Sequence, residues 1–441
     1  MITSERIKDY LEQHHLLSFR YLFLILLTAL TLICIMTITS ASFQEESESL
    51  VVDPTLAILV HKDNEVGVNE HGEYGLGSLH WTNESGEDMW CYSVILSEDP
   101  ALERPYEYQT YPSQIGVQGF LLRMIAKLVR STAAIPISRW FCAALFSVVI
   151  VWITVLIFRQ YGFAFAVSFW CVTTFSSWIC DFAPNLYWVS FTWFVPVLLG
   201  LICLRSEKKR KWIYLLFFVA LLIKCLCGFE YLSTIMVSAE LFMAAEWITY
   251  KEKRSRLTRS IMLSGICMLA GFVVVAVLMC FIYGNGDFVD GAVYFKHYLV
   301  ERRTFGNADQ FDAVYADSLN ASIMNVLNRY TNGVGTPLLI ISGLDLILIA
   351  LDRFLFKRDR KLDLSLLLIS CAATFSWFVL AKSHSYIHIH LNFVLYYMGF
   401  AQTAVYCLLR FFLNHIRIEF LQSDENAAST LNSRIRLRFT K

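Results

Sequence analysis

Residues 261–283 read IMLSGICMLAGFVVVAVLMCFIY, 23 residues without a charged side chain. The hydrocarbon core of a bilayer is about 30 Å thick, and a helix needs roughly 20 apolar residues to cross it. This stretch therefore predicts a membrane-spanning helix. A basic cluster, 251–259, precedes it and a long loop of mixed charge, 284–336, follows it, so its two ends face different surroundings.

The same pattern recurs along the chain. Of the 441 residues, 56% are hydrophobic and only 17% are charged, whereas about a quarter are charged in a soluble domain. We therefore expect an all-α polytopic membrane protein of about ten transmembrane helices with a small mixed external region. The predicted spans are 21–41, 139–158, 163–180, 187–204, 212–228, 231–249, 261–283, 337–351, 364–381 and 391–413.

The first span has an alternative interpretation as a signal peptide. Thr39-Ser40-Ala41 would suit a small-residue cleavage site. The apolar run is, however, longer than the core of a signal peptide and follows 20 residues of chain. A retained membrane anchor is therefore favoured.

Basic clusters predict the orientation. They lie at 205–211, 251–259 and 353–361 and in the tail at Arg434, Arg436 and Arg438, each after an even-numbered span. Because cytoplasmic loops are rich in Lys and Arg, we expect a multi-pass protein of the cell inner (plasma) membrane. Both terminal segments, 1–20 and 414–441, are then cytoplasmic, and loops 42–138 and 284–336 are external. Spans two to seven occupy 139–283, and spans eight to ten occupy 337–413.

The first long loop, 42–138, is strongly acidic before position 123 and ends in an amphipathic segment. Short apolar runs at 56–60 and 94–96, separated by glycines, predict strands and turns. In 119–130 the three cations Arg123, Lys127 and Arg130 share one helical face beside an apolar remainder. The segment therefore predicts an interfacial helix, with an ordinary amphipathic helix packed on the loop as the alternative.

The positions of the cysteines and the absence of repeats disfavour several classes of protein. Eleven of the 12 cysteines lie in or beside apolar segments and no Cys-x-x-Cys pair occurs, which disfavours a disulfide framework or a zinc ribbon. The chain has no internal repeat, which disfavours an inverted-repeat transporter. We expect the lipid bilayer as a partner and no nucleic acid.

Ionisable residues at the external ends of the predicted helices are the first candidate site residues, because such groups are costly in lipid and often mark function. Asp181 and Asn185 lie in a tight turn, where helix capping is the alternative role. Glu230 follows the next short turn, where it could bind substrate or act as a base. A structural ion pair between Lys224 and Glu230 is the alternative. Two cations of loop 284–336 are candidates for anion binding: Arg302 and Arg303.

The run KSHSYIHIH at 382–390 has the highest density of side chains that could bind a ligand. His384, His388 and His390 would share a face in an extended chain, whereas His384 and His388 would pair in a helix. Hydrogen bonding to phosphate or sugar hydroxyls, with Lys382 as the cation, is favoured. A metal site at these histidines is disfavoured because Lys382 would repel the ion, so we assign no metal ligand. A divalent metal is still considered as a possible cofactor of the protein. Interfacial polar residues without a ligand are the remaining alternative.

The order of these segments resembles the GT-C superfamily of integral membrane glycosyltransferases, which use polyprenyl-phosphate-linked sugars as donors. One helix is followed by a long acidic loop with an interfacial helix, and then by many helices and a later loop with cations. Segments 111–119 (YPSQIGVQG) and 228–231 (GFEY) also look like parts of bacterial envelope-polysaccharide membrane proteins. Within the first of them we take Gln114 as a candidate for substrate binding.

The resemblance implies a catalytic carboxylate in the first loop, soon after the first helix. The positions that match are Glu45, Glu46, Glu48 and Asp53. The carboxylate would activate an acceptor hydroxyl on an envelope glycan or lipid, which displaces the phosphate of a polyprenyl-phosphate sugar donor. Lys382, His384, Arg302 and Arg303 would balance the developing phosphate charge.

We accordingly expect a first-loop carboxylate, Glu230, Asn185, Lys382 and His384 to converge on one cleft. The alternatives are a polysaccharide polymerase or ligase, a lipid or solute transporter, and a non-catalytic envelope scaffold.

Overall fold

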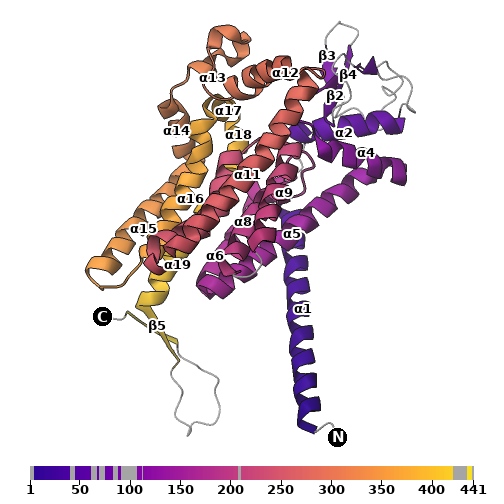
Figure 1. Cartoon of the computed structure of the whole chain (residues 1–441). Helices are drawn as coiled ribbons and strands as arrows, with labels where there is room; N and C mark the ends of the chain where they lie inside the picture. Colours follow the sequence, from indigo (N-terminus) through magenta and orange to yellow (C-terminus); the bar gives the residue numbers. More distant parts are fainter. Residues whose placement is uncertain are drawn as a thin grey trace, which may run out of the picture.

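The computed structural model of the chain describes residues 4–39, 45–60, 67–68, 75–82, 88–90, 107–111, 113–206, 210–420 and 435–439. Most of these residues are helical (Figure 1). The α-helices are α1 (Ser4–Ile38), α2 (Glu45–Val60), α4 (Val117–Val129), α5 (Ala134–Tyr161), α6 (Phe163–Thr174), α7 (Ser177–Phe182), α8 (Phe191–Arg205), α9 (Arg210–Cys227), α10 (Leu232–Thr249), α11 (Arg254–Tyr283), α12 (Phe288–Tyr294), α13 (Ala316–Asn320), α14 (Ile323–Thr331), α15 (Thr336–Phe354), α16 (Lys361–Leu380), α17 (Lys382–Ile387), α18 (Ile389–Asn392) and α19 (Phe400–His415). Short 3-10 or π turns are η2 (Lys251–Lys253), η3 (Phe295–Glu301), η4 (Ala308–Gln310), η5 (Ala313–Tyr315), η6 (Gly333–Gly335) and η7 (Phe393–Tyr397). The strands are β1 (Gly67–Val68), β2 (Gly77–Thr82), β3 (Asp88–Trp90), β4 (Glu107–Thr110), β5 (Ile416–Phe420) and β6 (Ile435–Phe439).

The long helices run between two ends of the molecule (Figure 1). We call one end the loop end; it contains α2, α4, α12 to α14, α17 and the strands β2 to β4. We call the opposite end, on whose side both chain termini lie, the termini end. At the loop end a small sheet has the strand order β1-β4-β2-β3, in which β1 is parallel to β4 and the other pairs are antiparallel. At the termini end β5 and β6 form an antiparallel pair.

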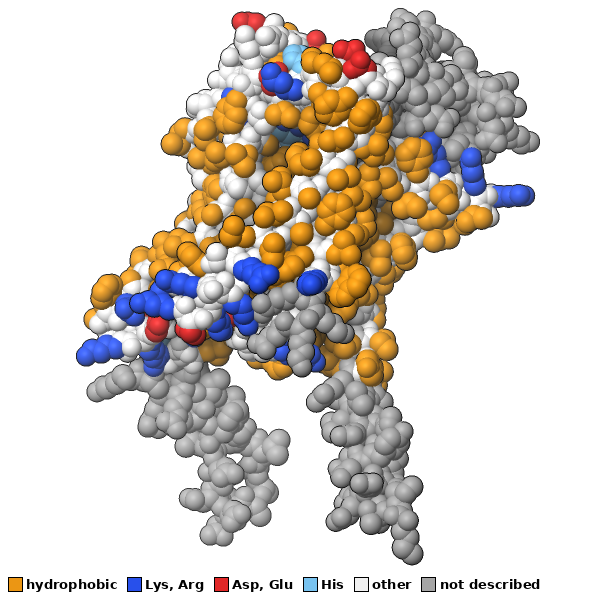
Figure 2. Space-filling model, in the orientation of Figure 1, with side chains coloured by type: hydrophobic (Ala, Val, Ile, Leu, Met, Phe, Trp, Pro, Cys, Tyr) orange, Lys and Arg blue, Asp and Glu red, His pale blue; other side chains and the backbone are white. Residues whose placement is uncertain are grey.

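Six helical stretches in the described ranges are long and apolar enough to cross a bilayer. They are Tyr21–Ile38, Ala134–Tyr161, Leu232–Thr249, Lys251–Tyr283, Gly333–Phe354 and Lys361–Leu380. Large apolar side chains cover the middle of the face drawn in Figure 2, and Lys and Arg side chains gather toward the termini end. An apolar surface of this extent is unfavourable in water, so the chain is a helical membrane protein.

Two segments that hydropathy predicts as single spans are broken. Segment 163–180 divides into α6 and α7, because the Ser176 side chain caps α7 by accepting a hydrogen bond from the Ile179 amide. Segment 391–413 begins as α18 and η7 and continues as α19 only after Gly399, whose φ is 129°. Both predictions of an unbroken helix were wrong, because apolar composition does not report local caps and turns.

Helix α2 stands where the sequence predicts the first strand of the loop. Residues 56–60 continue α2, so the strand prediction was wrong there. Glu48, Val51, Val52 and Thr55 are buried at helical spacing, and α2 packs on α4 and β2. The buried carboxylates obscure this apolar period in the sequence. The second predicted run, 94–96, lies outside the described residues.

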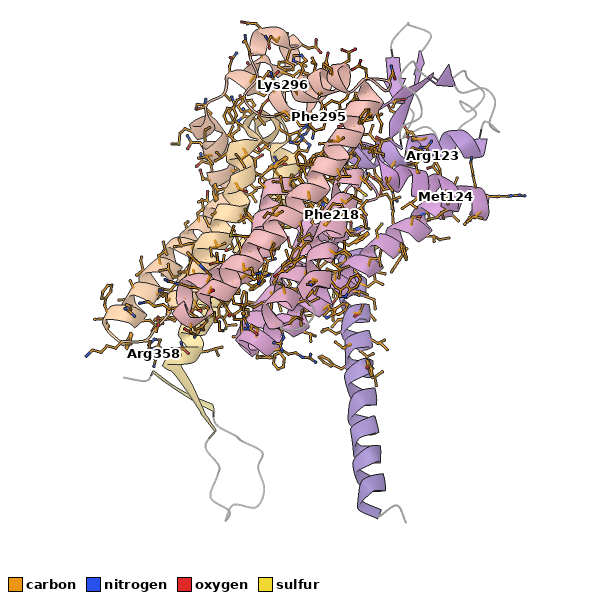
Figure 3. All side chains as sticks on the ribbon, in the orientation of Figure 1. Arg123, Met124, Phe218, Phe295, Lys296 and Arg358 are labelled. Carbon is orange, nitrogen blue, oxygen red and sulfur yellow. The ribbon has the colours of Figure 1, made fainter. Side chains whose placement is uncertain are left out.

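Helix α4 agrees with the helix predicted over 119–130. Its buried side presents Gln118, Gly119, Leu122 and Ala126, and Gly119 lies so close to Gly75 that a Cβ there would be 1.8 Å from the Gly75 carbonyl oxygen. Figure 3 labels Arg123 and Met124 on this helix, beside the bundle. Its exposed apolar residues are Phe120, Leu121, Met124, Leu128 and Val129. The chain leaves this side uncovered, as an interfacial helix requires.

Aromatic side chains hold three segments together below the loop end. Helix α10 packs against α8, α11 and α16. At its start the Tyr231 ring stacks on Trp188, with ring centroids 5.4 Å apart, and meets Trp377 of α16 edge to face at 5.6 Å. Buried aromatic pairs of this kind add to the stability that burial itself provides. They fix the turn before α10 against the turn before α8.

Candidate functional site

The turn between α9 and α10 holds the Glu230 carboxylate inside the protein. The Lys224 ammonium donates a hydrogen bond of 2.7 Å to the Gly228 carbonyl oxygen. Glu230 instead pairs with Arg303, whose Nη1 lies 3.3 Å from Glu230 Oε1, and both side chains are buried. Lys224 and Glu230 thus have separate partners, and the alternative of a structural ion pair between them is not what the structure shows.

Gln114 contacts the same turn from the segment before α4. In the amide orientation that satisfies both groups, the Gln114 nitrogen donates to Glu230 Oε2 at 3.3 Å and to the Cys227 carbonyl oxygen at 3.2 Å. Gly228 has a φ of 153°, and a Cβ there would lie 2.2 Å from the same Gln114 amide nitrogen. Only glycine leaves room for this contact.

Arg303 connects the second loop to α17. It follows η3, and its carbonyl oxygen accepts a hydrogen bond of 3.1 Å from the His384 amide. Its neighbour Arg302 donates to the Tyr315 hydroxyl at 3.3 Å and lies over that ring. The two arginines are therefore held on one side by Glu230 and α17 and on the other by Tyr315.

A cavity of about 450 Å³ opens among these groups at the loop end. Its polar lining consists of Tyr111, Ser113, Tyr294, Tyr298, Arg302, Arg303, Tyr315, His384 and His388. The described lining contains two arginines and no carboxylate. Glu230 behind the wall balances the charge of Arg303, so the net positive charge of the wall comes from Arg302. Arginine matches the geometry of phosphate and carboxylate oxygens, so the cavity is suited to an anion.

His384 and His388 face each other across one helical turn, as the helical alternative for segment 382–390 predicts. Their ring centroids are 4.5 Å apart. Burial, followed by the charges of His390 and Arg303, lowers the pKa of His388 to about 4. Burial and the neighbouring His388 and Arg303 lower the pKa of His384 well below its usual value. Both imidazoles are therefore neutral at pH 7, and each can donate one hydrogen bond to an anion.

The lowered pKa of His388 makes stability depend on pH. The unfolded chain takes up this proton near pH 6.5, whereas the folded chain resists it down to about pH 4, so the contribution is present above about pH 6.5 and is lost as the pH falls to about 4. Between pH 7 and pH 4 the parent should lose about 1–3 kcal/mol more unfolding free energy than His388→Gln. The measurement is denaturation in detergent, with His297→Gln at the same end as control. Parallel curves for the parent and His388→Gln would contradict the assignment.

The first-loop carboxylates lie beside the turn at Asn185. Glu48 is buried, its Oε1 accepts a hydrogen bond of 2.9 Å from the Leu186 amide, and its Oε2 pairs with Arg139. Burial raises the pKa of Glu48, and Arg139 opposes that rise. Asp53 is also buried within α2. Glu45 and Glu46 begin α2, but their side chains lie outside the described residues.

Asn185 and Asp181 each have hydrogen-bond partners away from the cavity. The Asn185 side-chain oxygen accepts hydrogen bonds from the amides of Tyr187 and Trp188, at 3.0 and 3.3 Å, within the turn before α8. The prediction of helix capping was wrong, because Ser190 is the N-cap of α8 and Asp181 lies inside α7. Asp181 accepts a hydrogen bond of 3.4 Å from the Thr39 hydroxyl of the residue after α1. Neither residue lines the cavity.

Lys382 and His390 lie outside the lining of the cavity. The Lys382 ammonium donates to the carbonyl oxygens of Leu319 and Ala321, at 2.5 and 2.7 Å, and so fastens the end of α13 to α17. The His390 ring centroid is 6.0 Å from that of His388. Of the groups expected in one cleft, His384 is in the cavity wall and Glu230 contacts that wall through Arg303. Glu48, Asn185 and Lys382 are engaged elsewhere.

The tyrosines of the cavity are not among the site residues predicted from the sequence. Tyr294 and Tyr298 are one helical turn apart and precede Arg302 by one further turn, a spacing that the printed sequence does contain. Tyr111 was noted only within segment 111–119. It meets the buried Tyr187 ring at 6.5 Å and so joins the cavity to the turn that holds Glu48.

Among the described residues, no group of three or more His, Cys, Asp or Glu side chains is placed to hold a metal ion. The family models, the curated proteins and the solved structures with which we compared the chain yielded no match.

Proposed function

We propose that this membrane protein transfers a sugar from a polyprenyl-phosphate donor to an envelope glycan or lipid acceptor, and that the cavity at the loop end holds the donor phosphate. The observation that carries the proposal is the cavity wall, in which Arg302 and Arg303 lie beside the neutral imidazoles of His384 and His388. The arrangement concentrates positive charge and hydrogen-bond donors without an opposing carboxylate in the described lining.

The chemistry follows from charge. Attack of an acceptor hydroxyl at the anomeric carbon breaks the bond to the phosphate oxygen and leaves a lipid phosphate with an additional negative charge. Arg302 and Arg303 stabilise that charge as it develops, and the imidazoles donate hydrogen bonds to the same oxygens. Tyr294, Tyr298 and Tyr315 also line the cavity and could contact the sugar.

The carboxylates divide into two roles in this proposal. Glu230 is a positioning residue, since it reaches the cavity only through its pair with Arg303. The base remains one of the first-loop carboxylates, Glu45, Glu46, Glu48 or Asp53. Glu48 can accept a proton only when its pair with Arg139 opens.

We place the loop end outside the inner (plasma) membrane and both termini in the cytoplasm, with about ten membrane crossings. The support is the basic character of the termini end, where Arg159, Arg205, Lys251, Arg353 and Lys361 are exposed. The shorter helices α6, α8, α9 and α19 would complete the crossings by lying between the longer ones.

The orientation is testable by cysteine labelling in intact cells. We expect a membrane-impermeant maleimide to label Asp309→Cys from outside and to label Arg353→Cys only after the membrane is opened, because the two residues lie at opposite ends. The unsubstituted chain provides the background from its own cysteines. External labelling at position 353 would reverse the proposed topology.

The activity is tested with a radiolabelled polyprenyl-phosphate hexose and envelope membranes as acceptor, in proteoliposomes. Arg302→Gln and Glu230→Gln should each lower transfer about 100-fold, which is typical of losing one electrostatic contribution. Lys296→Gln is the matched control, because Lys296 is an exposed cation of the same loop (Figure 3). Parent-like transfer by both folded site variants would refute the proposed site.

Proton- or ion-coupled transport is a second candidate, favoured by carboxylates in the middle of two spans. Asp345 of α15 is buried, and neither of its oxygens has a hydrogen-bond partner among the described residues. Glu240 of α10 accepts a hydrogen bond of 2.6 Å from Ser264 of α11. Such residues often mark ion pathways. Asp345→Asn should abolish coupled uptake by a transporter and leave sugar transfer by the proposed enzyme near the parent rate.

A further inference from the structure

A second polar cavity, of about 500 Å³, lies at the termini end of the bundle, away from the proposed catalytic site. It is formed by the ends of α5, α10 and α19, the start of α6 and α16, and η2. The residues that give it its character are Gln160, Glu246, Tyr250, Lys253, Arg410 and Asn414.

Glu246 organises this cavity from within its wall, through contacts to three neighbouring side chains. Its Oε1 accepts hydrogen bonds from Gln160 at 2.6 Å and from Tyr161 at 3.3 Å, and its Oε2 pairs with Lys253 at 2.8 Å. The carboxylate is buried, so these donors neutralise it within the wall. The partly exposed Lys253 ammonium is thereby fixed over the Tyr250 ring with further N–H groups toward the cavity.

Arg410 supplies the second cation. Its hydrogen bonds to Asp363 and to the Tyr406 hydroxyl both use Nη1, which leaves Nε and Nη2 as donors in a side chain that is 34% exposed. Arg205 places a further cation beside the cavity, since it donates to the lining residue Gln160 at 3.2 Å. Arg159 and Lys361 are the chain neighbours of the lining residues Gln160 and Leu362.

The rim of the cavity is apolar on the side of the helices. Phe163 and Leu413 line it and are 71% and 56% exposed. In a membrane protein such side chains lie against acyl chains, while Lys and Arg at helix ends face the headgroups. Figure 2 shows this change from apolar to basic surface toward the termini end. One ligand can satisfy both parts: a phosphate group attached to acyl chains.

We propose that this cavity binds the headgroup of an anionic phospholipid, with the phosphate between Lys253 and Arg410 and the acyl chains along Phe163 and Leu413. Basic pockets between transmembrane helices recognise acidic lipids in this way. Free phosphate carries the same anionic group and could also bind the two cations. The adjoining apolar rim favours the lipid, because only the lipid has acyl chains to place there.

The test uses the full chain, delipidated in a neutral detergent, with binding followed by native mass spectrometry. Phosphatidylglycerol should bind at least 10-fold more tightly than phosphatidylcholine or inorganic phosphate. Lys253→Met/Glu246→Gln removes both members of the ion pair in the wall and should weaken phosphatidylglycerol binding about 10-fold. Arg205→Gln with Lys361→Gln changes only exposed cations and should weaken it by a similar factor. Arg353→Gln, an exposed cation of the same end outside the cavity, is the control.

Three results would overturn the proposal: equal binding of both phospholipids, phosphatidylglycerol binding that both multiple variants retain, or inorganic phosphate competing at the affinity of the lipid. Arg302→Gln at the loop end should leave phosphatidylglycerol binding unchanged. This separates the lipid site from the proposed catalytic cavity.

Discussion

Arg303→Met is expected to lower the unfolding free energy of the protein by about 3–5 kcal/mol, because it leaves the Glu230 carboxylate buried without its cation. Glu230 and Arg303 are both nearly inaccessible to water, so solvent cannot replace the lost partner. The measurement is chemical denaturation in detergent, followed by the fluorescence of the buried tryptophans.

The double variant Arg303→Met/Glu230→Gln separates stability from ligand binding. It removes both charges, so it should recover most of the lost stability. It should still bind polyprenyl phosphate 10- to 100-fold more weakly than the parent, since a charged hydrogen bond contributes about 1.5–3 kcal/mol. Recovery of both properties would mean that the arginine serves the fold alone.

Gly228→Ala should destabilise the turn between α9 and α10 by about 2–5 kcal/mol and lower sugar transfer with it. The new Cβ would lie 2.2 Å from the Gln114 amide nitrogen and 2.4 Å from Glu230 Oε2, at a φ of 153° that alanine rarely adopts. Backbone strain and overpacking each cost about 1–3 kcal/mol. Thermal denaturation and the transfer assay together measure the effect.

Gly343→Ala is the matched control. Gly343 lies inside α15, and a Cβ there would meet nothing within 4 Å, so this change should be neutral or stabilising by up to about 1 kcal/mol. Gln114→Ala combined with Gly228→Ala should recover only the part of the loss that comes from the clash with Gln114, since the clash with Glu230 and the backbone strain remain. An unaffected Gly228→Ala variant would show that the turn tolerates a different packing.

The sequence alone indicates a membrane protein, because a helix in lipid must be apolar along its whole length and this is visible in the composition. Segments such as 261–283 are apolar throughout, and α11 forms there as expected. The breaks at Ser176 and Gly399 were missed because each depends on one cap or one backbone conformation. Helix α2 was missed because the burial of Glu48 relies on Arg139, which is 91 positions later in the sequence.

The candidate site was only partly predictable for the same reason. Arg302, Arg303, His384 and His388 were recognisable as donors for an anion, and they line one cavity. The partners of Lys382 and Glu230 could not be read from the sequence, since a carbonyl oxygen or a remote arginine leaves no local pattern. The tyrosines resemble ordinary interfacial aromatics until the fold brings Tyr111 beside Tyr294 and Tyr298.

The most direct test of the central claim is photocrosslinking of a polyprenyl phosphate that carries a diazirine in its first isoprene unit. Peptide mapping should place the crosslinks at the loop end, within 294–303 and 382–388, and Arg302→Gln should reduce them about 10-fold while Lys296→Gln does not. The matching polyprenol, which lacks the phosphate, should crosslink weakly. Equal crosslinking by the polyprenol, or crosslinks confined to the termini end, would contradict a phosphate site in this cavity.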